Sequence, residues 1–438
     1  MPHVRPFRAL RFRSEAVGDL SLVLSPPYDV VSPDEQRRLL ARHPRNVIRL
    51  DLPETEAGED PEERYRRAAR TLATWRSDGT LSKDPRPAVY VYEQTYSVPG
   101  SGVERTQRGF FARLRLEAPG DGSVLPHERT LDAPKEDRYR LLRATGVNTS
   151  PVVGLYSDET GAAARLLEGV AATPPEIEVR DDEGVRHRLW SVPEDPEAGG
   201  PAKTLAGLAG AGPITIADGH HRYETALRYR DERRMARSCE EDPPFDYLLM
   251  LFLDAASEPL TVLPTHRLVR GLEAAEVRAG AATLFHVEGV SREALLESFG
   301  SASGEGGRGR FGLWTRSGGA LLTARREALE RWLPPGGAAV RSLDVTLLGI
   351  ALERLFGIDA GAVGAGDRVG YTKSAEEALA MVDRGMDDPT APDAAFLLEP
   401  TPVASIVAVA AAGDVMPQKS TYFYPKPLTG LLINPHEW

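Results

Sequence analysis

Apolar and polar residues alternate with two different periods along the first third of the chain. Residues 88–96 (AVYVYEQTY) and 106–116 (TQRGFFARLRL) follow the period of two that is typical of a half-buried strand. A segment rich in Pro, Gly and Ser joins them, so the pair predicts a β-hairpin. Residues 33–43 and 61–78 carry helix start signals or helical apolar spacing, which predicts two helices. This part of the chain therefore combines strands and helices.

Two short apolar runs predict buried strands in the middle of the chain. Residues 213–217 (PITIA) lead directly into a helix that we expect to reach about Arg237, and residues 246–254 (DYLLMLFLD) form the second run. The remainder alternates helices and strands around a glycine-rich run. The predicted fold class is α/β of the mixed α+β kind, with several mixed sheets and packed helices. We expect an N-terminal α/β region with the hairpin, a region with the turn after the first buried strand, and a C-terminal α/β region: residues 1–156, 157–270 and 271–438.

Composition narrows the class of protein. The 438 residues are 41% hydrophobic and 27% charged, which is the balance of a soluble globular protein. The net charge of −11 argues against general binding to nucleic acid or to anionic membranes. No run approaches the ~18 apolar residues of a membrane span, and the first residues lack the apolar core of a secretory signal. The single cysteine, Cys239, excludes an internal disulfide framework. We therefore expect a cytoplasmic protein with a small-molecule substrate.

Lysine is scarce in this chain, which makes the few lysines informative. Only six of the 53 basic residues are Lys, so Arg is used wherever it is tolerated. A lysine that persists more often occupies a position that needs a compact point charge. Two of the six, Lys419 and Lys426, lie in one segment together with Ser420, Thr421 and several aromatic residues. Because a lysine suits a phosphate, we interpret both as candidate nucleotide contacts.

The most informative motif, DGHHR at residues 218–222, follows the first buried strand. A strand that turns at once into a helix leaves backbone N–H groups unpaired at the helix N-terminus, which suits a phosphate. Gly219 lets the backbone approach a ligand closely, and the three residues after it can carry positive charge. Two other interpretations stay open. One is a metal ion shared by His221 and Glu224, and the other is a plain helix N-cap at Asp218 with solvated side chains.

A second group of residues offers a general base. Glu128 is the first candidate for the carboxylate that accepts a hydroxyl proton, with His127 and Arg129 beside it as substrate contacts. Asp29 is the second candidate, because two prolines hold the turn at Tyr28 and Asp29 in an extended conformation. Both carboxylates also fit structural roles, a surface ion pair for Glu128 and a turn for Asp29.

A further charged pair, His266 and Arg267 in the segment PTHR, follows a predicted strand. It fits either a charged substrate or a turn with a hydrogen-bonded histidine. The sequence contains no Walker A motif, no G-x-S-x-G elbow and no H-E-x-x-H motif. The prediction of a phosphate site therefore depends mainly on residues 218–222.

The segment ADGHHRYETAL resembles the signature of a bacterial and archaeal domain-of-unknown-function family. The resemblance extends to PPYDVVS, LPHERTL, NTSP, PTHR and MPQKSTYFYPKP, and so covers the chain from Phe7 to Ile433. Members of this family are about as long as this chain. The family name itself conveys no activity.

The DGHHR core alone is similar to the phosphate-binding strand–turn–helix of the ParB/sulfiredoxin-like superfamily, which includes kinases of free serine. That similarity implies ATP or ADP with Mg²⁺ as cofactor. Carried over by position, it implies phosphate contacts at four residues, with Asp218 orienting the loop or the metal: Gly219, His220, His221 and Arg222. This chain is much longer and lacks the helix-turn-helix of partition proteins, which disfavours a role in DNA partition.

Together these features predict a nucleotide-dependent phosphotransferase that acts on a small polar metabolite, by analogy with a free serine kinase. Glu128 or Asp29 would take the hydroxyl proton, while His221 and its neighbours would stabilise the transferring phosphoryl group. Lys419 or Lys426 would neutralise charge. Two alternatives use the same site. One is a hydrolase of a phosphate ester or nucleotide, and the other is a non-catalytic regulator that senses a nucleotide.

Overall fold

The computed structural model describes most of the chain. The described residues are 1–118, 120, 122–128, 130, 132–195, 197, 199–236, 241–300, 309–386, 388 and 390–438. Three residues named above, Arg129, Arg237 and Cys239, lie outside them. Within the described part of the chain, no helix is long and apolar enough to cross a membrane.

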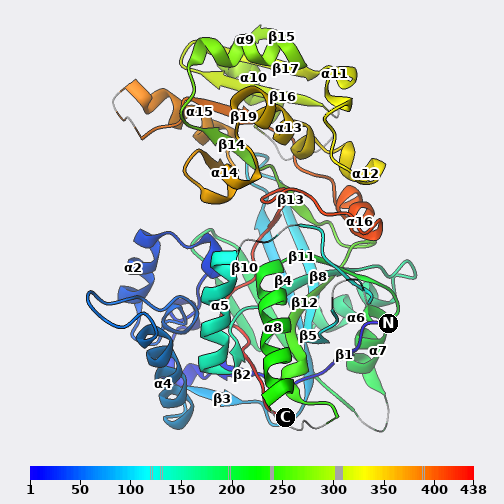
Figure 1. Cartoon of the computed structure of the whole chain (residues 1–438). Helices are drawn as coiled ribbons and strands as arrows, with labels where there is room; N and C mark the ends of the chain where they lie inside the picture. Colours follow the sequence, from blue (N-terminus) through cyan, green and yellow to red (C-terminus); the bar gives the residue numbers. More distant parts are fainter. Residues whose placement is uncertain are drawn as a thin grey trace.

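A mixed sheet of nine strands forms the larger of two α/β bodies (Figure 1). Its order is β6-β11-β8-β12-β5-β4-β10-β9, with β1 pairing to β5. The predicted hairpin is confirmed as the antiparallel pair β4 and β5. The bounds of these strands are β1 (Val4–Arg5), β4 (Ala88–Ser97), β5 (Glu104–Arg115), β6 (Val124–Leu125), β8 (Val152–Tyr156), β9 (Ile177–Arg180), β10 (Arg186–Pro193), β11 (Ile214–Asp218) and β12 (Tyr247–Asp254).

Both faces of this sheet are covered, which explains why β12 is a continuous apolar run. Leu248 and Met250 pack with side chains of the helices α6, α7 and α8, whereas Leu249 and Leu251 face the opposite cluster. The predicted helices at 33–43 and 61–78 are confirmed as α2 and α4. The helices of this body longer than one turn are α2 (Pro33–Arg42), α4 (Glu63–Ser77), α5 (Asp132–Thr145), α6 (Ala162–Ala171), α7 (Gly200–Ala209) and α8 (His220–Ala236).

A second sheet of six strands, in the order β15-β17-β16-β19-β14-β18, forms the smaller body. We call residues 264–412 the small-sheet domain and the rest the large-sheet body. The strands are β14 (His266–Val269), β15 (Phe285–Val290), β16 (Arg310–Thr315), β17 (Gly318–Ala324), β18 (Val369–Thr372) and β19 (Ala394–Leu397). The main helices are α9 (Ala274–Leu284), α10 (Arg292–Phe299), α13 (Asp344–Phe356), α14 (Ala360–Ala365), α15 (Ala375–Asp383) and α16 (Val403–Ala411).

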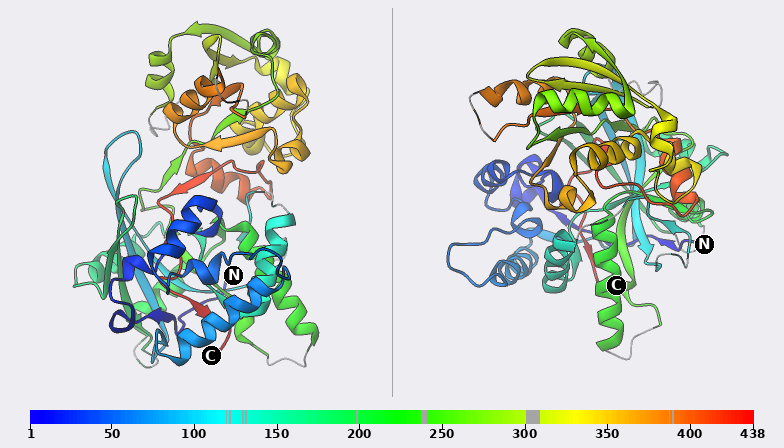
Figure 2. Two further views of the ribbon diagram at one scale, coloured as in Figure 1. Left: turned by 90° about the vertical axis from the view of Figure 1, so that its left-hand side faces the viewer. Right: turned by 45° about the horizontal axis from the view of Figure 1, so that its top comes forward.

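After α16 the chain returns to the large-sheet body (red in Figures 1 and 2). There β20 (Tyr422–Tyr424) pairs with β13 (Thr261–Leu263), and β21 (Asn434–Pro435) pairs with β7 (Val147–Asn148). The predicted regions 1–156 and 157–270 therefore share the nine-stranded sheet, and the range 271–438 contributes to both bodies. We assign each strand to one of the two bodies by the sheet in which it is paired.

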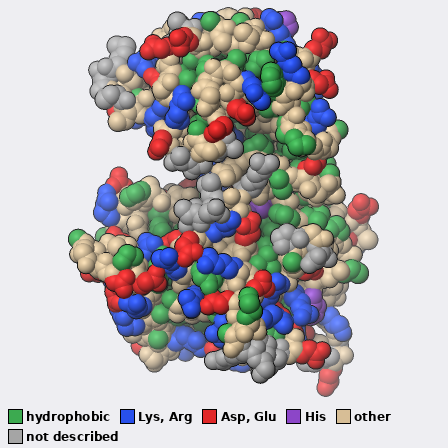
Figure 3. Space-filling view, viewed as in Figure 1, with side chains coloured by type: hydrophobic (Ala, Val, Ile, Leu, Met, Phe, Trp, Pro, Cys, Tyr) green, Lys and Arg blue, Asp and Glu red, His purple; other side chains and the backbone are tan. Residues whose placement is uncertain are grey.

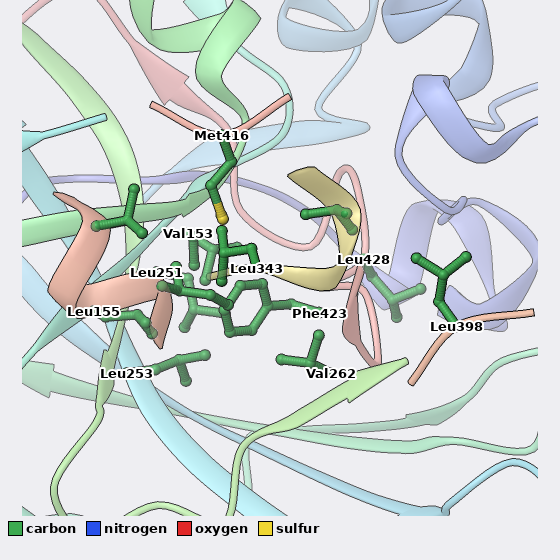
Figure 4. Close-up of a cluster of buried hydrophobic side chains, with 14 of the residues drawn as sticks. Val153, Leu155, Leu251, Leu253, Val262, Leu343, Leu398, Met416, Phe423 and Leu428 are labelled. Carbon is green, nitrogen blue, oxygen red and sulfur yellow. The ribbon is translucent and has the colours of Figure 1, made fainter. Parts of the chain in front are cut away.

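An apolar core lies where the returning segment meets both bodies (Figure 4). Met416, Phe423 and Leu428 of that segment are buried against strands β8, β12 and β13. Leu343 and Leu398 enter the same core from the small-sheet domain. Full burial of each such side chain contributes about 1.5–3 kcal/mol relative to exposure. This packing holds the segment that contains Lys419 and Lys426 between the two bodies.

Candidate functional site

A cavity of about 280 Å³ lies between the two bodies, and we call it the polar pocket. Three parts of the chain line it: the large-sheet body, the end of β18 in the small-sheet domain, and the returning segment. In the space-filling view the surface is hollowed between the two bodies (Figure 3). The lining includes most residues that the sequence singled out: Tyr28, Asp29, Glu128, Asp218, Gly219, His220, His221, Arg222, Lys419 and Lys426.

The wall of the pocket is built around the turn between β11 and α8. β11 ends at Asp218, Gly219 has a φ of 90°, and α8 begins at His220. A side chain at position 219 would be strained at that φ and would place its Cβ 3.0 Å from Nε of Arg222. The first N–H groups of a helix lack intrahelical acceptors, so the start of α8 presents donors and a partial positive charge at the pocket.

Asp218 is neutralised within the pocket by two cations. Its Oδ1 accepts a hydrogen bond from Nζ of Lys426 at 3.1 Å, and its Oδ2 accepts one from Nη2 of Arg222 at 2.8 Å. Burial would raise the pKa of this carboxyl, but Lys426 and Arg222 outweigh it and hold the pKa well below its usual range. Because both oxygens are already bonded to cations, Asp218 does not fit the predicted role of a Mg²⁺ ligand.

His220 is a buried neutral imidazole, unlike the cation that a phosphate cradle would use. Its ring packs edge-on against that of His127, with centroids 4.5 Å apart. The backbone N–H of His127 donates to Nε2 of His220 at 3.3 Å, which leaves the ring proton on Nδ1. Burial lowers the pKa of both rings, to about 4 for His127. His127 is fully buried and supports His220 from behind the pocket wall.

His221 and Arg222 occupy the wall in different ways. His221 is half-buried, and burial together with nearby Lys419 lowers its pKa. The guanidinium of Arg222 faces the pocket but already donates to Asp218 and to the backbone oxygen of Pro151. Arg222 therefore fixes Asp218 and the turn, while its charge still contributes to the field in the pocket.

Among the carboxyls that line the pocket, Glu128 has the proton affinity that suits acid–base chemistry near neutrality. It accepts backbone hydrogen bonds from Lys419 at 3.0 Å and from Ser420 at 3.2 Å. Burial raises its pKa to about 7, although these two bonds and the charge of Lys419 act in the opposite direction. Lys419 adopts a φ of 56°, so the backbone bends around this carboxylate. Asp29, exposed at the edge of the same pocket, is a second carboxylate.

Three of the six lysines in the chain line the polar pocket: Lys373, Lys419 and Lys426. The Nζ atoms of Lys373 and Lys426 lie 4.0 and 4.2 Å from the ring centre of Tyr422. Burial lowers the pKa of Lys373, and the charge of Lys426 lowers it further. Together with Arg222 these lysines give four basic side chains against three carboxylates, so the pocket favours an anion.

The structure places His266 and Arg267 outside the polar pocket. Alternate residues of a strand face opposite sides. His266 is fully buried, with its Nδ1 accepting from the backbone of Leu398, whereas Arg267 lines a neighbouring cavity. Arg267 donates to backbone oxygens of Thr265 and of Lys419.

Thr421, which the sequence places in the same segment as Lys419 and Lys426, also lines the pocket. Other pocket residues were missed by the sequence reasoning: Thr265, Tyr371, Thr372, Lys373, Gln418 and Tyr422. The scarcity of lysine was the one signal that could have indicated Lys373. Among the described residues, no group of three or more His, Cys, Asp or Glu side chains could hold a metal ion.

Fold and site together define an α/β protein of two bodies, with a pocket between them that is lined by four basic side chains and three carboxylates. The chain belongs to the family described as "Protein of unknown function (DUF1015)", whose model matches residues 4–346. This match ends before Lys373, Lys419 and Lys426, and is shorter than the expected span from Phe7 to Ile433. No curated protein matches the chain in sequence.

Solved structures with a similar chain trace share little sequence with this protein. A free serine kinase in complex with AMP is 14% identical, with 69% of this chain and 83% of that chain covered at a TM-score of 0.35. A conserved hypothetical protein from Pyrococcus furiosus is 13% identical, with 70% and 88% covered at 0.34. SbnI with a C-terminal truncation, from Staphylococcus aureus, is 10% identical, with 71% and 84% covered at 0.34.

Proposed function

We propose that this protein is a phosphotransferase that moves a phosphoryl group from ATP or ADP to a hydroxyl group of a small polar metabolite. One observation carries the proposal. A carboxyl with a pKa of about 7, Glu128, lines the same pocket as four basic side chains and the N-terminus of a long helix. Phosphoryl transfer needs positioning, charge neutralisation and a proton acceptor, and this pocket contains groups for all three.

The phosphates would bind to Lys373, Lys419 and the first N–H groups of α8. Lys426 and Arg222 stay paired with Asp218, so they hold the wall of the pocket and contribute to its field. A Mg²⁺ ion that enters with the nucleotide is normally held by phosphate oxygens, water and one or two carboxylates. Asp218 does not fit that role. The basic side chains of the pocket would therefore neutralise the negative charge of the phosphates.

In the transfer step, the acceptor oxygen forms a bond to the terminal phosphorus while the bond from phosphorus to the nucleotide's bridging oxygen breaks. The hydroxyl proton passes to Glu128, which releases it to solvent, and the nucleotide leaves one phosphoryl group shorter. A base with a pKa near the working pH suits this role. Asp29 is the alternative base.

The charges around the pocket also favour a zwitterionic acceptor. Asp29 can pair with an ammonium group, and a lysine can pair with a carboxylate. A free hydroxy amino acid such as serine has both groups and a hydroxyl. This matches the analogy with free serine kinases that the DGHHR motif implies.

Phosphorus NMR tests the proposal directly. Purified protein would be incubated with Mg²⁺ and ATP or ADP, with and without pooled hydroxyl metabolites that include L-serine. The proposal predicts a new phosphomonoester signal that requires the pool, and splitting the pool names the acceptor. Formation of inorganic phosphate alone would contradict it and identify a hydrolase. Unchanged spectra would contradict both and leave a nucleotide sensor.

A further inference from the structure

A second cavity, of about 370 Å³, adjoins the polar pocket, and we call it the apolar cavity. Tyr371 and Gln418 line both spaces, so the two are neighbours across these side chains. Most of its walls come from residues 332–371 of the small-sheet domain and from residues 413–418. Its aliphatic and proline side chains include Val340, Ile350 and Val363.

One buried charge lies where the two spaces meet. Arg267 is 7% exposed, and its guanidinium lies 4.7 Å from the ring centre of Tyr371. Its hydrogen bonds go to backbone oxygens, and in the described part of the chain no carboxylate is within ion-pair distance of it. Burial lowers the pKa of Arg267, whereas Tyr371 and the carboxylate of Glu128, which lies beyond ion-pair distance, act in the opposite direction. A buried guanidinium that no carboxylate pairs directly is costly unless a ligand supplies an anion or strong acceptors.

We propose that the apolar cavity binds the nucleoside of the nucleotide whose phosphates enter the polar pocket. This inference rests on the proposed function, because it requires a ligand whose phosphates are bound in the adjoining polar pocket. A nucleobase is flat and weakly polar, so it requires apolar walls and a few hydrogen-bonding groups at its edge. The polar pocket is lined mainly by polar and charged residues, whereas the apolar cavity offers such walls.

The charged groups of the two spaces suit the groups of a nucleotide. Lysines surround the phosphate end, and Arg267 lies near the junction, where the ribose and first phosphate would pass. Three carboxylates line the apolar cavity: Glu353, Asp359 and Asp414. Glu353 and Asp359 are exposed, so they can accept hydrogen bonds from an exocyclic amino group. An amino-bearing purine such as adenine fits this arrangement.

Gly349 allows a sharp test, because it lies on α13 and lines the apolar cavity. A Cβ at this position would meet no atom within 4 Å. Gly349→Phe therefore extends a ring into the cavity without a backbone clash, and Gly349→Ala is the matched control. Both replace a helical glycine, which favours the helix.

Calorimetric titration with ADP and with inorganic tripolyphosphate separates the two spaces. We expect Gly349→Phe to weaken ADP binding at least about tenfold and to leave tripolyphosphate binding unchanged, whereas Gly349→Ala changes neither. Equal ADP affinity for Gly349→Phe and wild type would overturn the inference while sparing the phosphate site. Failure of wild type to bind tripolyphosphate would instead overturn the proposed function.

A second measurement needs no variant. In a saturation-transfer NMR experiment on wild-type protein with ADP, the methyl signals of valine, leucine and isoleucine are saturated. The saturation should transfer more strongly to the base protons of ADP than to its ribose protons. Absence of transfer to the base protons of bound ADP would overturn the inference.

Discussion

The polar pocket and the apolar cavity are neighbours, yet they are assembled in different ways. The pocket collects side chains from positions as distant as Asp29, Glu128, His221 and Lys426, so only the tertiary structure brings them together. The cavity is formed largely by residues 332–371 of one domain. In the pocket, ion pairs and backbone hydrogen bonds hold charges in place, whereas the cavity depends on packing around a single buried cation. Substitutions in the polar pocket should therefore affect binding of the phosphates, whereas substitutions in the apolar cavity should affect binding of the nucleoside.

The largest effect is expected for Glu128→Gln, which removes the proposed base from the polar pocket. Turnover should fall by about 10²–10⁴-fold while nucleotide affinity is kept. In wild type, turnover should rise as pH passes through about 7, because Glu128 accepts a proton only after losing its own. Initial rates from pH 5 to 9 measure this rise, which we call the pH limb near 7.

Glu258→Gln is the matched control, because burial also raises the pKa of Glu258 to about 7, and this side chain accepts from the backbone N–H of Arg108 away from the pocket. The limb should persist in that variant. A pH limb near 7 that survives Glu128→Gln would show that another group is the base.

The next largest effect is expected for Lys426→Met, which leaves Asp218 without one of its two partners. The uncompensated carboxylate would repel phosphates, so ADP and tripolyphosphate should both bind about 30–100-fold more weakly. Lys203→Met, at an exposed position on α7, is the control. Calorimetry measures both affinities. Loss of ADP binding with unchanged tripolyphosphate binding would contradict the assignment of this wall to phosphates.

Arg267→Met tests the junction between the two spaces. We expect roughly tenfold weaker ADP binding and a smaller loss for tripolyphosphate, because Arg267 lines the apolar cavity. Arg326→Met, on the exposed surface of α11 (Arg326–Glu330), is the control. Equal losses for the two ligands would place the action of Arg267 in the polar pocket.

The smallest effect concerns stability and lies outside both spaces. The pKa of Glu258 is raised in the fold, so its stabilising contribution is complete below about 4.5 and is lost as pH rises through about 7. Gln imitates the protonated form. The melting temperature of Glu258→Gln relative to wild type should therefore increase from pH 5 to pH 8. A difference that does not change with pH would refute this origin.

Local patterns predicted those parts of the structure that depend on local chemistry. Strand alternation predicted the hairpin of β4 and β5, and the strand–turn–helix was evident because Asp-Gly interrupts an apolar run. The buried, neutral state of His220 was not predictable, since it depends on His127, which lies 93 positions earlier. The pairing of Asp218 with Lys426 likewise spans 208 positions.

The apolar cavity left no signal in the sequence, because aliphatic residues that line a cavity have the same pattern as residues of a core. The division of the chain was also obscured. Residues 413–438 leave the small-sheet domain and pack with the large-sheet body, and the pairings of β20 with β13 and of β21 with β7 reveal this return.

A crystal structure of the wild-type protein with ADP and Mg²⁺ tests the central claim most directly. We expect the phosphates to lie within hydrogen-bond distance of Lys419 and of the first N–H groups of α8, beside Glu128. Phosphates bound elsewhere, or a pocket without nucleotide at saturating ADP, would contradict it.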